Sequence, residues 1–241
     1  MSTLRRFPVI SAAALLVLSV GLAACGEETA PTASDPERTT TAPVEPDGDP
    51  TETNDPVDES DLPGERMDLF WPDGAELAVV GVAADDVLNV RRLPDPGADA
   101  VGELAPLAEG VVSTGHSRLV DSGFWVEVEH DDVSGWANTA YLAYLGDAQD
   151  RTDEASRVGP QASLEALGAA VADELGGEDG TIVAESDMTI VIDLVSSGEG
   201  DDSVRGSRLR ITASSQGSAY ALDTVEVLPL CIRGVSDGVC L

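Results

Sequence analysis

Residues 87–91 have the sequence VLNVR and open a stretch, residues 87–142, in which short apolar runs alternate with turn residues. The later runs are VGEL at 101–104, WVEV at 125–128, GW at 135–136 and AYL at 140–142. Short apolar runs bounded by glycine, proline and aspartate are typical of strands joined by tight turns. The stretch therefore predicts a small antiparallel β-barrel, which we expect to occupy residues 67–147.

The same runs, in the same order, resemble the bacterial SH3 (SH3b) domain family. The shared pattern is L-N-V-R, then P, V-G-x-L, G, W-x-x-V, G-W and Y-L, and it covers residues 87–142 only. The resemblance implies an SH3-like barrel that binds cell-wall peptide, often the stem or cross-bridge of peptidoglycan. It also implies a peptide groove near W-x-x-V and Y-L, with Trp125, Tyr141 and Tyr144 as ligand-binding residues.

Alternation along residues 124–129 predicts which side chains face the barrel core, because successive side chains of a strand point to opposite faces. The apolar set Phe124, Val126 and Val128 is expected to be core, which places Trp125 on the outer, polar side. An outward Trp125 suits a ligand contact. The alternative is that its ring lies flat over the barrel rim and binds nothing. Trp136, beside a turn glycine, is expected to be core.

The composition is strongly acidic. Asp and Glu number 45 against 13 basic residues, all of them arginine, and the formal net charge is -32. Nucleic-acid binding needs a basic surface, so this charge argues against it, and likewise against broad docking on anionic lipid. Solvation explains the bias, and a salt-adapted or GC-rich source would produce it equally.

Residues 1–24 form a targeting segment with two early arginines and an apolar run too short for an ordinary membrane-spanning helix. The segment ends in LAAC at 22–25, which resembles the lipobox of bacterial lipoproteins. That resemblance implies diacylglycerol on Cys25, at the extracytoplasmic face of the cell membrane. A plain secretory signal is the alternative. Residues 25–66, rich in Thr, Pro, Glu and Asp, predict a disordered acidic tether.

Residues 151–241 predict a separate α+β domain, with one helix on an antiparallel sheet. Leucine and valine at 164, 167, 171 and 175 fall on one helical stripe, preceded by Pro160 and ended by two glycines. Strands are expected at 181–184, 188–195, 208–212 and 220–228, with a turn at 197–202. Residues 70 and 71, Phe-Trp, are expected to pack rather than bind a ligand.

Three cysteines occur in the chain, and lipidation would use Cys25. Cys231 and Cys240 then remain as an even pair in an exported protein, which predicts a disulfide. The chain-entropy model gives such a short loop about 2–3 kcal/mol of stabilisation. A metal site is the alternative, although no histidine lies nearby in the sequence.

Signals for catalysis are weak in the sequence: no serine stands in an S-x-x-K context, and the two histidines, His116 and His130, stand alone. Arg205, Arg208 and Arg210 could hold an anion, or could pair across strands with acidic neighbours such as Asp223. We therefore expect a mainly β, non-enzymatic lipoprotein without a cofactor or metal. Its expected partners are the membrane, through Cys25, and peptidoglycan; docking to an envelope protein is the alternative.

Overall fold

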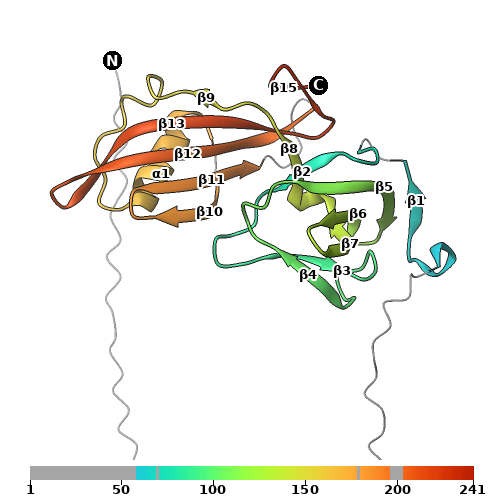
Figure 1. Ribbon diagram of the computed structural model, residues 1–241. Coiled ribbons are helices and arrows are strands. Elements are labelled where there is room, and N and C mark those ends of the chain that lie inside the picture. Colours follow the sequence, from blue (N-terminus) through green and yellow to red (C-terminus); the bar gives the residue numbers. More distant parts are fainter. Residues whose placement is uncertain (1–57, 69–70, 178–179, 196–202) are drawn as a thin grey trace, which may run out of the picture. The chain divides into compact units, whose positions relative to one another are not determined.

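Antiparallel strands dominate the computed structural model (Figure 1), as the short apolar runs predict. The structure describes residues 58–68, 71–177, 180–195 and 203–241, all within one compact unit that spans residues 54–241. Cys25, Phe70, most of the predicted tether and the whole predicted turn at 197–202 lie outside the described residues.

Residues 59–145 hold eight strands and two 3-10 helices. They are η1 (Glu59–Asp61), β1 (Glu65–Met67), β2 (Glu76–Val79), β3 (Leu88–Arg91), β4 (Ala100–Leu104), β5 (Val111–Val120), β6 (Gly123–His130), β7 (Val133–Asn138), η2 (Thr139–Tyr141) and β8 (Leu142–Leu145). Side chains from these strands and from the connection between β1 and β2 form one core, which includes Trp71, Leu77, Val90, Val126 and Leu142. Trp136 is buried, as expected.

The strands of the main sheet do not close into a barrel. The main sheet runs β10-β11-β12-β13-β8-β2-β5-β6-β7-β3-β4, with β1 added to β5 and β9 (Gln149–Asp150) added to β13. Among the described strands no pairing joins the two ends, so the prediction of a closed barrel is wrong. The physical reason is that β8 pairs with β2 on one side and with β13 on the other, which continues the sheet instead of closing it.

The C-terminal part consists of one helix on a four-stranded antiparallel layer. The helix is α1 (Leu164–Glu174), and the strands are β10 (Thr181–Ser186), β11 (Thr189–Val195), β12 (Val204–Gln216) and β13 (Ala219–Cys231). Ser163 caps α1 by accepting a hydrogen bond from the Ala166 amide at 3.1 Å. A Cβ at Gly168 would lie 2.6 Å from Ile192 Cδ1, so this glycine allows the helix to approach the sheet closely.

The two folded parts share one continuous sheet. Leu145 of β8 pairs with Leu230 of β13, and Ala78 of β2 pairs with Ala143 of β8. A separation into two domains is not seen in the described residues, and the domain boundaries at 147 and 151 stay predictions. The fold also begins before the predicted end of the tether, because η1 and β1 start at residues 59 and 65.

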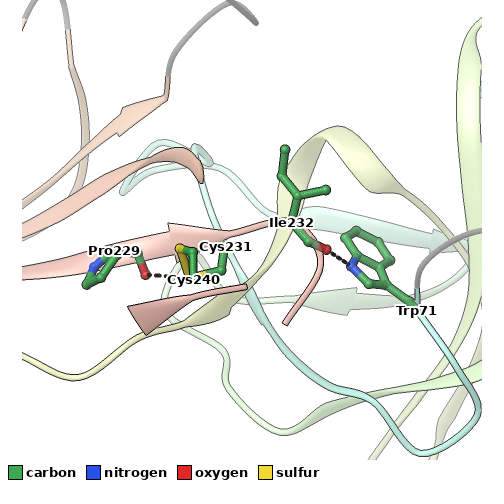
Figure 2. Close-up of a disulfide and its surroundings, with 5 residues drawn as sticks. All are labelled: Trp71, Pro229, Cys231, Ile232 and Cys240. Carbon is green, nitrogen blue, oxygen red and sulfur yellow. Dashed lines mark hydrogen bonds between the residues drawn. A yellow bond between two sulfur atoms is a disulfide. The ribbon is translucent and has the colours of Figure 1, made fainter. Parts of the chain in front are cut away.

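A disulfide joins Cys231 to Cys240, as predicted (Figure 2). The ring that it closes contains the short hairpin β14 (Val235–Ser236) and β15 (Val239–Cys240). The Trp71 indole donates a hydrogen bond to the Ile232 carbonyl at 2.5 Å, which attaches the ring to the N-terminal core. Within the described ranges, no helix has the length and apolar character needed to cross a membrane.

Candidate functional site

A groove of about 650 Å³ opens beside Trp125, and we name it the Trp125 groove. The lining residues come from the loop after β2, from β3 and the turn that follows it, from the β5–β6 turn, and from β6, β7, η2 and β10. They are Gly81, Val82, Ala83, Asp86, Val87, Leu88, Asn89, Arg91, Pro96, Ser122, Trp125, Asn138, Tyr141 and Thr181. Segments that are distant in the sequence therefore meet at one hollow.

Trp125 is only 3% exposed, so the prediction that it lies on an open outer face is wrong. Its cross-strand partner Arg118 shares that face and is buried as well. Arg118 donates hydrogen bonds of 2.8–3.1 Å to the carbonyls of residues 59, 62 and 64, so the segment treated as tether covers this face. The core prediction fails for Phe124, which is 39% exposed.

The buried Trp125 still borders the groove. Its indole N–H donates to Ser122 Oγ at 3.1 Å, and Ser122 is also a lining residue. An indole fixed in this way forms a rigid apolar wall, which suits an anchor for a ligand because little side-chain entropy is lost on binding.

Tyr141 is the exposed aromatic of the groove, with 43% of its surface accessible. It lies in η2, where the Asn138 side chain accepts a hydrogen bond from the Ala140 amide at 2.9 Å. Tyr144 is not among the lining residues of the groove: it packs against the N-terminal core, and burial raises the pKa of its hydroxyl. The structure thus brings together two of the three predicted ligand residues.

Charge is sparse in the groove, although the whole chain is strongly acidic. Asp86 and Arg91 are the charged side chains among its lining residues. Arg91 donates to the Ala98 carbonyl at 2.6 Å, and Asp86 accepts from the Val87 amide at 2.8 Å. The remaining polar side chains are neutral, so the groove suits a polar, nearly neutral ligand with an apolar portion.

A second hollow, of about 630 Å³, adjoins the groove and shares Pro96 and Ser122 with it. Its lining includes three carboxylates, Glu65, Asp95 and Asp121. Acidic side chains therefore gather at this second hollow, whereas the Trp125 groove itself is nearly neutral.

The histidines lie outside both hollows. His116 Nδ1 is 2.8 Å from Glu127 Oε2, and His130 Nε2 is 3.7 Å from Asp131 Oδ2. Over the described ranges, no group of three or more His, Cys, Asp or Glu residues is arranged to hold a metal ion.

The three clustered arginines make contacts within the protein. Arg208 is buried against Asp193 at 2.7 Å, and Arg210 lies 3.4 Å from Glu226 at the surface. Arg205 donates to two backbone carbonyls around η2, and burial lowers its pKa. The contacts of Arg208 and Arg210 agree with the alternative that these arginines pair across strands with acidic neighbours. The acidic partners are Asp193 and Glu226 rather than Asp223.

The sequence interpretation missed Asp193. Its signal was present, because a single carboxylate interrupts the apolar strand TIVIDLV at 189–195. A charge at such a position requires a buried partner, and Arg208 is that partner.

Comparison of this chain with models of protein families, with curated proteins and with solved structures finds no match.

Proposed function

We propose that the protein is a lipoprotein held at the extracytoplasmic face of the cell membrane through lipid on Cys25. Residues 67–147 act as an SH3b-like module, an open set of strands, that binds peptidoglycan or cell-wall peptide in the Trp125 groove. The module has no catalytic role, and it needs no cofactor.

The convergence of the family-like motifs on one hollow supports this proposal. The L-N-V-R run contributes Leu88, Asn89 and Arg91, the W-x-x-V run contributes Trp125, and the Y-L run contributes Tyr141. The sequence resemblance rests on those same segments. Neutral hydrogen-bonding groups between two aromatic side chains are what a short polar peptide requires of its site.

An exposed apolar pair favours an alternative, docking to a protein of the cell envelope. Phe124 and Leu119 are cross-strand partners at one end of β5 and β6, and they are 39% and 36% exposed. Apolar surface of this kind is common at protein interfaces. In this alternative the groove has no wall ligand and the β5–β6 end carries the contact.

Retention on purified peptidoglycan, with residues 26–241 as the soluble fragment, separates the two functions. We expect the wild type to be retained and Tyr141→Ala to lose about tenfold in affinity, the effect of removing one modest aromatic anchor. Phe124→Ala is the matched control, since it removes a similarly exposed aromatic outside the groove. A wild type that is not retained contradicts wall binding, and a loss of retention confined to Phe124→Ala would mean that peptidoglycan contacts the β5–β6 end instead of the groove.

A further inference from the structure

One wall of the Trp125 groove is the loop that leaves β2, formed by Gly81, Val82 and Ala83. β2 ends at Val79 and β3 begins at Leu88, so the loop belongs to neither strand. Gly81 has φ +67°, a conformation that favours glycine. The position of this wall therefore depends on contacts from outside the loop.

Those contacts come from the C-terminal part of the sheet. The Gly81 amide donates to Asp193 Oδ2 at 2.8 Å, and the Ala84 amide donates to the Ile182 carbonyl at 2.9 Å. Thr181, the residue before Ile182, lines the groove from β10. The β10–β11 hairpin thus supplies both a lining residue and the anchors of the loop.

Asp193 is fixed in turn by Arg208. The guanidinium donates to Asp193 Oδ1 at 2.7 Å and to Oδ2 at 2.9 Å, and it also donates to the Val79 carbonyl at 2.7 Å. Both side chains are about 1% exposed. The pair therefore holds the loop at two points, the carbonyl where β2 ends and the amide of Gly81.

A buried ion pair adds little stability compared with two apolar side chains of similar size, because desolvation offsets the attraction. Apolar side chains, however, offer no directional bonds to the Val79 carbonyl or the Gly81 amide. What this pair contributes beyond packing is the position of the loop.

We infer that Asp193 and Arg208 are positioning residues for the Trp125 groove, through which the C-terminal part of the sheet sets the geometry of the binding site. The inference rests on the proposed function for its ligand. It also assigns a role to the β10–β11 hairpin, for which the sequence suggested none.

The test compares two double variants of the full-length chain in detergent. Asp193→Leu with Arg208→Met replaces the buried pair by apolar residues, and the control, Glu226→Leu with Arg210→Met, makes the same changes at the exposed pair of the neighbouring strands. Hydrogen–deuterium exchange is followed on peptides covering residues 79–84. Retention on purified peptidoglycan is measured in parallel.

We expect exchange at the Gly81 amide to be about tenfold or more faster in the buried-pair variant alone, the effect of losing one hydrogen bond to a charged group. Retention should fall by about tenfold in the same variant. If that variant does not fold, Asp193→Asn, which keeps the size but weakens both sets of bonds, is measured in the same way.

If the buried-pair variant folds and exchange at the Gly81 amide is unchanged, the inference is overturned, whether or not the variant is retained on peptidoglycan. Faster exchange with full retention overturns the link to binding. Faster exchange in a protein whose wild type is not retained supports the positioning of the loop and contradicts the proposed wall ligand, so the two failures are distinguishable.

Discussion

Replacement of Trp125 by alanine tests whether the groove is built on the core of the fold. The indole is 3% exposed, and its N–H is bonded to Ser122. An aromatic side chain buries about 150–250 Å², which at ~25 cal/mol per Å² corresponds to about 4–6 kcal/mol as an upper estimate. Measured Trp→Ala changes in cores of about 3–5 kcal/mol agree with this value.

We therefore expect Trp125→Ala to lower the free energy of unfolding by about 3–5 kcal/mol, close to the loss for Trp136→Ala. Trp136 is the control because it is also 3% exposed but does not line the groove. Urea unfolding followed by far-ultraviolet circular dichroism, with the disulfide intact, measures both variants. A Trp125→Ala loss below about 1 kcal/mol, the size typical of a peripheral site, would refute the assignment of Trp125 to the core.

Three other perturbations have defined outcomes. Cys25→Ala should leave the chain uncleaved or release it from the membrane fraction, and wild-type protein that takes up no fatty-acid analogue would contradict lipidation. Serine at both Cys231 and Cys240 should lower the free energy of unfolding by about 2–3 kcal/mol, because the closed ring is short; an unchanged urea midpoint would argue against this. Arg118→Met should remove the three bonds to residues 59–64 and speed tryptic cleavage after Arg66, whereas unchanged cleavage would show that the segment is held by other contacts.

The local features that the sequence predicted were those with a strong short-range signal. The helix over residues 164–174 follows from its apolar stripe, from Pro160 before it and from the two glycines after it. The disulfide follows from cysteine parity. Each depends on residues close together in the chain, so no knowledge of the distant packing was needed.

The exposure of Trp125 could not be predicted in this way. The alternation rule assumes that one face of a strand meets water, but segment 59–64 covers that face through Arg118. Composition alone assigned that segment to the tether. The open sheet has a similar cause, since the pairing of β8 with β13 joins residues more than eighty positions apart.

Only part of the candidate site was accessible from the sequence. Family-like motifs indicated Trp125 and Tyr141, whereas Thr181 and the loop at 81–83 come together only through the sheet. Tyr141 lies in η2 and lines the groove, whereas Tyr144 lies in β8 and packs against the N-terminal core, a difference that the Y-L motif does not specify.

The bonds of Arg118 have a mechanical consequence. A pull applied at the N-terminal side of the folded unit reaches η1 and the three-residue strand β1 before it reaches the core. β1 pairs with β5 over only three positions, while a single guanidinium holds the segment at three carbonyls. Tension on the chain would therefore act on the bonds of Arg118 first. Residues 58–67 would then detach and extend, while the strands that line the Trp125 groove stay in place.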